Sequence, residues 1–194
     1  MRLSGRILVT GANGFIGRAL CEHFARASVD YVAAVRSLGL RDGIAFAQLL
    51  VTEEGEVFVV EVAARIPAGQ MADLVRLGTG IDLVEIALRQ ALGAPVTDDM
   101  VRPRFQRPLA IRFLTASPGI LPLGQVISAD GLDRVRAAPG VLDAGLYIQI
   151  GETIRPVQVD SDRRGYVIAT AADPRAALEL AQAATRHLRI EVAP

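Results

Sequence analysis

The feature that most constrains the fold is a pair of apolar runs that lie close together in the first half of the chain. Ile44–Thr52 and Glu56–Val62 are strand-like runs, and only Glu53–Gly55 separates them. A short turn containing glycine between two such runs is typical of a β-hairpin. The sequence therefore predicts two antiparallel strands here, and any fold proposed for the chain has to contain them.

The second strand of this hairpin carries a single acid, Glu61, within the apolar run VFVVEV. Burial of a carboxylate is costly unless it is paired or binds a cation. Gln48 lies on the facing strand, and two oxygen-bearing side chains from adjacent strands suit Mg²⁺. Arg65 adds a forked guanidinium that suits phosphate or carboxylate. These residues predict a metal and anion site, and the alternative is a buried ion pair between Glu61 and Arg65.

Beyond the hairpin, the spacing of apolar residues predicts helices at Met71–Leu77 and Asp82–Leu92, with Asp82 as N-cap and Gly93 as the stop. Residues 94–108 are rich in Pro, Asp and Arg and are expected to be a linker. After it the pattern is mostly β, with short helices at Leu132–Ala137 and Pro174–His187, the second capped by Asp173. Strands are expected at Leu109–Thr115, Ile120–Ile127, Val141–Ile150, Gly165–Thr170 and Arg189–Val192.

The N-terminus contains a strand–turn–helix–strand pattern. Strands are expected at Arg6–Thr10 and Tyr31–Val35, and a helix at Phe15–Ala27. Such a unit forms a right-handed parallel pair. Glycines at the turn permit a tight bend, close approach of a pyrophosphate and close packing of the helix, and the helix N-terminus then faces the negative charge. The glycines of this turn are Gly11, Gly14 and Gly17.

The stretch GRILVTGANGFIGRAL resembles the opening of the extended short-chain dehydrogenases, in particular the nucleotide-sugar epimerases. The resemblance implies a dinucleotide site in which Arg36, after the second strand, selects NADP through its 2′-phosphate. It covers about 37 residues, whereas a dinucleotide fold uses two larger halves. That family's catalytic pair is Tyr-x-x-x-Lys, which this chain cannot supply because it contains no lysine. Two interpretations of the N-terminal unit remain open: it serves only to pack against the rest of the chain, or it is a residual nucleotide-binding module without catalysis.

A second resemblance begins at the hairpin. Glu61-Val-Ala-Ala-Arg65 followed by Pro67-Ala-Gly69, then Thr79-Gly80-Ile81-Asp82-Leu83, is similar to the signature of ATP-grasp ligases, closest to the carboxylate–amine ligases that join L-amino acids. FLTASPGIL and DRRGYVIATAADPRAALELA, within 113–192, resemble the C-terminal region of those ligases. The resemblance implies that Gln48 and Glu61 bind magnesium, that Arg65 contacts the transferred phosphate or acyl phosphate, and that Gly69 leaves room for the substrate.

The ligase resemblance implies a reaction in which ATP and Mg²⁺ convert a carboxylate to an acyl phosphate, which an amine then attacks. Those enzymes hold ATP with lysines and a loop from a central domain. All 21 basic residues here are arginine, and nothing before Gly43 resembles that domain. Arginine does not replace lysine's compact charge. We expect a partner chain to supply the ATP-anchoring half. A non-catalytic module and a recombination remnant without selected activity are the alternatives.

The composition of the chain bears on its expected location and on its classes of partner. Hydrophobic residues make up 51% of 194 positions, and the longest apolar runs are too short to span a bilayer, so no membrane association is expected. The formal net charge of zero gives no electrostatic case for nucleic acid. A single cysteine, Cys21, suits a reducing cytoplasm. Open strand edges favour self-association.

The sequence thus predicts an α+β chain of three parts. Residues 1–37 form a partial Rossmann-like β–α–β unit, 43–94 an ATP-grasp C-terminal lobe fragment of antiparallel strands with helices, and 108–194 the β-rich C-terminal domain of a ligase. The partners expected by resemblance are small carboxylate and amine substrates.

Overall fold

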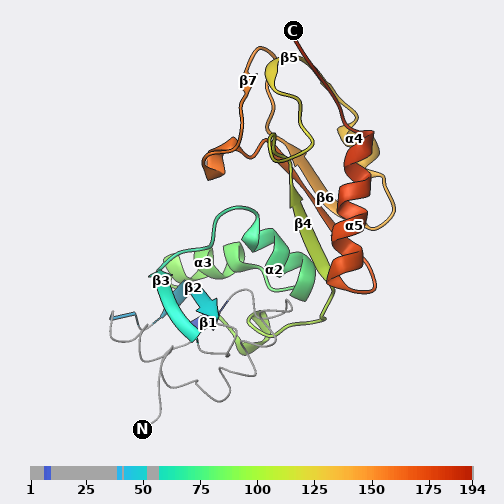
Figure 1. Cartoon of the computed structure of the whole chain (residues 1–194). Coiled ribbons are helices and arrows are strands. Elements are labelled where there is room, and N and C mark those ends of the chain that lie inside the picture. Colours follow the sequence, from blue (N-terminus) through green and yellow to red (C-terminus); the bar gives the residue numbers. More distant parts are fainter. Residues whose placement is uncertain (1–6, 10–38, 41, 52–56, 194) are drawn as a thin grey trace. The chain divides into compact units, whose positions relative to one another are not determined.

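The computed structural model describes residues 7–9, 39–40, 42–51 and 57–193 of the chain (Figure 1). Contacts divide the chain into two compact units, Met1–Gln106 and Arg107–Pro194, and each is described by itself. Among the described residues, no helix has the length and apolar character that crossing a membrane requires.

The first unit contains a sheet of three strands in the order β1-β2-β3 (Figure 1). β2 (Gly43–Val51) and β3 (Val57–Ala63) are antiparallel, which confirms the predicted hairpin. β1 (Ile7–Val9) pairs in parallel with β2, with Ile7 opposite Gly43. The helix and second strand predicted for the N-terminal β–α–β unit lie outside the described residues.

Two helices follow the hairpin, and their ends carry the predicted signals. α2 spans Met71–Thr79 and α3 spans Leu83–Ala91. The Asp82 carboxylate accepts hydrogen bonds from the backbone N–H groups of Val84 and Glu85, both at 2.9 Å, so Asp82 is the N-cap of α3. Gly93, just past the end of α3, has a left-handed φ of 67° that glycine adopts without strain. The linker contains one short 3₁₀ turn, Asp98–Met100.

The core of the first unit lies between α3 and the sheet. Ile44 of β2, Ile81, and Leu83 and Ile86 of α3 are buried together. Ile66, Val75, Met100 and other partly buried residues pack against them. This core holds α3 against β2.

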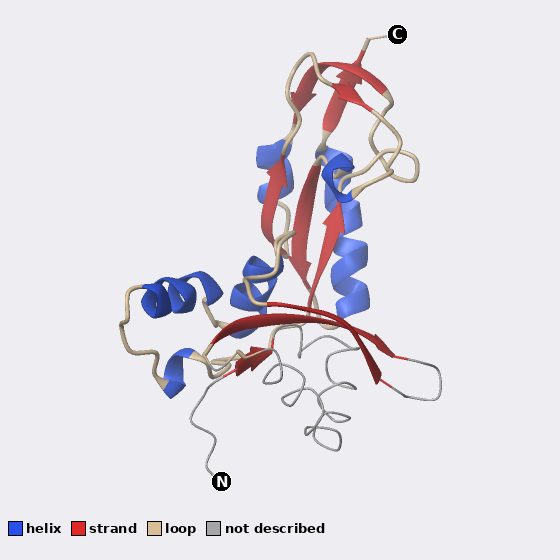
Figure 2. Cartoon of the chain, turned by 90° about the vertical axis from the view of Figure 1, so that its left-hand side faces the viewer, coloured by secondary structure: helices blue, strands red, loops and turns tan. Residues whose placement is uncertain are grey.

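The second unit holds two three-stranded antiparallel sheets (Figure 2). The first has the order β4-β8-β6, and the second the order β7-β5-β9. Together with the first unit this is a mixed α/β fold with antiparallel sheets. Its strands are β4 (Leu109–Phe113), β5 (Gly124–Asp130), β6 (Val141–Leu146), β7 (Thr153–Ile154), β8 (Gly165–Thr170) and β9 (Arg189–Val192).

Two helices accompany the first of these sheets, α4 (Leu132–Arg136) and α5 (Pro174–Ala184). α5 lies along β4 and β8 (Figures 1 and 2). Asp173 caps α5 by accepting the Ala176 N–H at 2.9 Å, and Pro174 occupies the first turn, as the sequence predicts. The core beneath includes Leu114, Val167 and Ala181, all fully buried. Short 3₁₀ turns stand at Asp160–Asp162 and Thr185–His187.

Two strand predictions in this unit were wrong at their ends. The strand expected at Ile120–Ile127 begins only at Gly124, because the preceding residues close a turn in which the Leu121 N–H donates to the Thr115 carbonyl at 3.0 Å. The strand expected at Val141–Ile150 ends at Leu146. The short strand β7 has no clear apolar period and was not predicted.

The turn Asp160–Asp162 shows how an acidic stretch is held locally. The Asp162 carboxylate accepts the backbone N–H groups of Gln158 and Val159, at 2.8 and 3.0 Å. These two hydrogen bonds stabilise the charged form and lower the pKa of Asp162. Asp160 pairs with Arg163 at 2.7 Å. The acids of this turn therefore serve the turn itself.

Candidate functional site

The hairpin brings the two predicted metal ligands opposite each other. Gln48 on β2 is the register partner of Glu61 on β3. The register then skips a residue, because Leu49 pairs with Val59. Val60 is therefore the extra residue of a β-bulge, a feature often found beside functional sites, where it re-aims a side chain.

The bulge decides which face Glu61 occupies. Continuing the register from the Leu49–Val59 pair without a bulge would place Val60 opposite Gln48, and Glu61 opposite Ala47 on the other face of the sheet. With Val60 extruded, Glu61 stands opposite Gln48 instead. An irregularity of one residue thus creates the pair of oxygen-bearing side chains.

Both members of the pair face solvent. Gln48 and Glu61 are exposed, and Val60 is 60% exposed. The expectation that Glu61 is buried within an apolar strand is therefore wrong. A strand turns alternate side chains to opposite faces only while its period of two is unbroken, and the bulge at Val60 interrupts that period directly before Glu61. What remains of the argument is the pairing of Gln48 and Glu61, which does not depend on burial.

Arg65 follows the end of β3 in an exposed loop. Its Nη1 donates to the Ile66 carbonyl at 3.1 Å. Within the described part of the chain no ion pair joins Arg65 to Glu61, and both are exposed, so the alternative of a buried ion pair is wrong. Gly69, also exposed, has φ 69° and Gln70 after it has φ 67°. These two left-handed residues turn the chain sharply into α2.

The donor set available here is small and made of oxygen. Across the described residues, no three His, Cys, Asp or Glu side chains gather as a metal cage. A carboxylate and an amide oxygen nevertheless fit Mg²⁺, which keeps several waters and binds through one or two protein groups together with substrate phosphates. The neutral Gln48 gives a weaker ligand than a second carboxylate. The hairpin can therefore hold a cation that a phosphate also ligates, with Arg65 available for the same anion.

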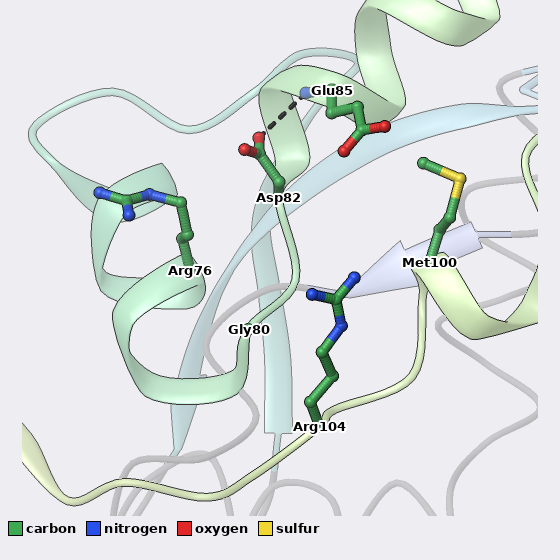
Figure 3. A pocket seen from close by; sticks show the side chains of 6 residues that line it. All are labelled: Arg76, Gly80, Asp82, Glu85, Met100 and Arg104. Carbon is green, nitrogen blue, oxygen red and sulfur yellow. Dashed lines mark hydrogen bonds between the residues drawn. The ribbon is translucent and has the colours of Figure 1, made fainter.

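A cavity of about 200 Å³ lies where α2 meets α3 (Figure 3). Sequence reasoning missed it because two of its residues, Met100 and Arg104, come from the segment taken as a linker. Its charged groups largely serve the fold: Glu85 pairs with Arg89 at 2.9 Å and Arg76 with Asp73 at 3.1 Å. Its lining residues are Arg76, Gly80, Asp82, Glu85, Met100 and Arg104.

A backbone hydrogen bond joins the linker to the end of α2 beside this cavity. The Arg104 N–H donates to the Thr79 carbonyl at 2.8 Å. A side chain at Gly80 would lie 3.1 Å from the Phe105 ring, so the glycine permits the close approach. We regard the cavity as the junction between the two helices and the linker, because its carboxylates and Arg76 already have local partners.

The predicted dinucleotide residues Gly11, Gly14, Gly17 and Arg36 lie outside the described residues. Of the predicted β–α–β unit, the structure describes only β1, whose parallel partner is β2 of the hairpin. The predicted partner strand, Tyr31–Val35, also lies outside the described residues.

Two family models match the chain. Residues 112–193 match the model described as L-amino acid ligase C-terminal domain 2. Residues 7–67 match the NAD dependent epimerase/dehydratase family. Both families named from the sequence are therefore matched: the epimerase model over a segment that includes the hairpin, and the ligase model over the second unit.

A curated relative, the uncharacterized protein y4rH of Sinorhizobium fredii, is 32% identical over 174 residues. The match covers 89% of this chain and 34% of the relative, so the chain spans about a third of the length of the protein it matches.

Solved structures give the same fold. An L-amino acid ligase from Bacillus licheniformis has a TM-score of 0.70 and 24% identity, covering 89% of this chain and 44% of that one. Phosphoribosylglycinamide synthetase from Anaerococcus prevotii has a TM-score of 0.68 and 14% identity, covering 82% and 39%. A third structure is the biotin carboxylase domain of Hydrogenobacter thermophilus 2-oxoglutarate carboxylase, solved with MgADP and bicarbonate. It has a TM-score of 0.60 and 17% identity, and the match covers 88% of this chain and 36% of that one. At these identities the likeness concerns the fold, that of the C-terminal part of ATP-grasp ligases.

Proposed function

We propose that this chain, which resembles the C-terminal part of ATP-grasp carboxylate–amine ligases, contributes the metal-binding strand pair and the acyl-phosphate arginine to such a reaction. Gln48 and Glu61 would hold Mg²⁺, Arg65 would contact the phosphate, and Gly69 would leave room for the substrate. The substrates are a small carboxylate and a small amine, as the resemblance implies. The chain spans less than half the length of these relatives.

The observation that carries the proposal is the Gln48–Glu61 pair. The two residues stand opposite each other beside the bulge and are exposed to solvent, and Glu61 precedes Arg65 by four residues. A bulge is a local departure from the regular ladder that leaves one residue unpaired. Here the bulge sets two oxygen-bearing side chains opposite each other, which supports the proposed role in binding a cation. The fold of the chain resembles that of a biotin carboxylase domain solved with MgADP, which supports a role beside a magnesium-bound nucleotide.

The reaction we propose has two steps. A carboxylate oxygen attacks the γ-phosphorus of ATP, the bond to the β–γ bridging oxygen breaks, and ADP leaves. The amine nitrogen then attacks the acyl carbon, loses a proton to solvent, and inorganic phosphate leaves as the amide forms. Bound Mg²⁺ would supply charge neutralisation at the phosphates. Arg65 would stabilise the charge on the transferred phosphoryl group, since catalysis of such transfers is mainly positioning and electrostatics.

The ATP-anchoring groups have to come from elsewhere. The chain has no lysine, and arginine does not reproduce its compact charge. We therefore propose that another polypeptide or segment supplies the part that holds ATP. The 194-residue chain by itself should form no amide from ATP, a carboxylate and an amine.

Cation binding by the hairpin is testable without turnover. Titration of the purified chain with Mn²⁺, followed by the loss of the free-ion electron paramagnetic resonance signal, should reveal one weak site. Glu61→Gln should weaken binding at least about tenfold, because it removes the only charged ligand. Gln48→Glu should tighten binding by a similar factor, because it adds a second carboxylate.

The matched control is Glu179→Gln, which removes an exposed carboxylate of α5 that pairs with Arg175. It should leave the Mn²⁺ titration unchanged. Equal affinity in the wild type and in Glu61→Gln would show that the hairpin does not bind the cation, and the proposed role of Glu61 would have to be abandoned.

A second candidate function, a non-catalytic NADP-binding module, is favoured by the epimerase match over residues 7–67. In calorimetry, NADP should bind more tightly than NAD if Arg36 contacts the 2′-phosphate. Gly14→Asp should abolish the heat signal, because it adds a side chain and a negative charge where the pyrophosphate would approach. Binding that survives this substitution, or no binding by the wild type, counts against the module.

A further inference from the structure

Helix α3 exposes an apolar stripe on the side that faces away from the core. Val84, Leu88 and Leu92 follow one another at intervals of four residues, so they line one side of the helix. They are 48%, 59% and 82% exposed. The opposite side is already occupied, because Leu83 and Ile86 are buried against the sheet. A surface helix normally has one apolar face, and a second one indicates an interaction surface.

The two flanks of this stripe differ in charge. Glu85 and Arg89 lie along one flank and pair with each other at 2.9 Å. Ala87 and Ala91 lie along the other flank. Ala87 packs partly against the core of the unit, whereas Ala91 is exposed and its small side chain permits close approach of a second helix. The flank with Glu85 and Arg89 therefore carries an acid toward the start of the helix and a base toward its end.

We propose that this face of α3 binds the same face of a second copy of the chain, with the two helices antiparallel about a two-fold axis. Two-fold symmetry brings a surface against itself, so the charged flank meets the charged flank of the partner. In the antiparallel arrangement Glu85 lies opposite Arg89 of the second copy, and Arg89 lies opposite its Glu85. The stripe supplies the buried centre, and the charges complement each other at the rim.

Charge also selects the antiparallel arrangement over the parallel one. In a parallel two-fold pair, opposite flanks meet, so Glu85 and Arg89 would face Ala87 and Ala91 and gain no partner. A reversed second copy matches this acid–base order by symmetry, because each Glu85 meets an Arg89 and each Arg89 meets a Glu85. The inference depends only on α3 and is independent of the proposed ligase chemistry.

The first test is the oligomeric state of the full chain. Sedimentation velocity over a range of protein concentrations should show a concentration-dependent dimer. Leu88→Glu should weaken association at least about tenfold, since it places a charge at the centre of a buried patch. Leu178→Glu is the matched control, because Leu178 is 40% exposed on α5 and lies outside the stripe. A wild type that is monomeric throughout, or equal effects of both variants, would overturn the proposal.

The second test uses charge exchange between copies. Glu85→Arg places Arg opposite Arg in its own dimer, and Arg89→Glu places Glu opposite Glu, so each variant alone should associate about tenfold more weakly. An equimolar mixture of the two should form a heterodimer with affinity near that of the wild type. Both variants lack the pair within the helix, so recovery on mixing reports contact between copies. Failure of the mixture to recover would contradict the antiparallel arrangement, even if Leu88→Glu proved poorly folded.

Discussion

Gly165→Ala should unfold the second unit at temperatures where the wild type is fully native. Gly165 begins the central strand β8 and has φ +153°, a backbone conformation that other residues rarely adopt. A Cβ there would overlap the backbone carbonyl of Gly145 on the neighbouring strand β6 and approach Leu114 Cδ1 to 2.9 Å. Because backbone has to move to relieve this overlap, we expect a loss of more than about 3 kcal/mol of stability.

The control for Gly165 separates steric overlap from backbone strain. Gly151 also has a positive φ, +89°, but an added Cβ would meet nothing within 4 Å. Gly151→Ala should therefore cost only the conformational penalty, about 1 kcal/mol. Near-ultraviolet circular dichroism can follow this unit, since it contains Tyr147 and Tyr166, two of the three tyrosines. Similar melting temperatures for the two alanine variants would refute the steric explanation.

Leu114→Ala is expected to have the second largest effect. Leu114 is fully buried in the core of the second unit. Its N–H donates to the Gly165 carbonyl at 2.9 Å and its carbonyl accepts the Arg164 N–H at 2.7 Å, so the backbone at this point is held on both sides. A fixed backbone leaves a cavity that cannot collapse, and the cost should fall in the range of about 2–5 kcal/mol.

Urea denaturation of Leu114→Ala should shift the midpoint without changing the slope, because the surface exposed on unfolding is nearly the same. Leu123→Ala is the matched control, since Leu123 is 50% exposed in the same unit. It should shift the midpoint little. If the two variants lose equal stability, Leu114 does not occupy the close-packed position that its burial indicates.

The parts of the fold that the sequence predicted well are those with local causes. Asp82 and Asp173 cap helices because a short acceptor side chain reaches the free N–H groups of the first turn, an interaction within a few residues. The hairpin follows from two apolar runs and a short turn. Gly93 ends α3 because it tolerates a left-handed conformation. None of these needs knowledge of distant residues.

The sequence does not reveal features of the structure that depend on distant residues or on an irregularity of a single residue. Apolar content does not reveal which side of α3 meets the sheet, because Leu83 and Leu88 are equally apolar and only the first is buried. The exposure of Glu61 depends on a bulge that leaves no mark in the strand's composition. Met100 and Arg104 reach a cavity through the path of the linker, which the sequence does not specify. That Gln48 and Glu61 lie on facing strands was predictable from the hairpin, but their direct pairing depends on the same bulge.

The bulge at Val60 also bears on how such a site changes during evolution. Gln48 and Glu61 stand opposite each other because of the number of residues in β3, so the pair is sensitive to strand length as well as to residue identity. Any exchange at Val60 that keeps the bulge keeps the pair. One inserted residue between Val59 and Glu61, unless a wider bulge absorbs it, would turn Glu61 to the opposite face. The proposed metal site would then be lost through a single inserted codon, although Gln48 and Glu61 would both remain in the sequence.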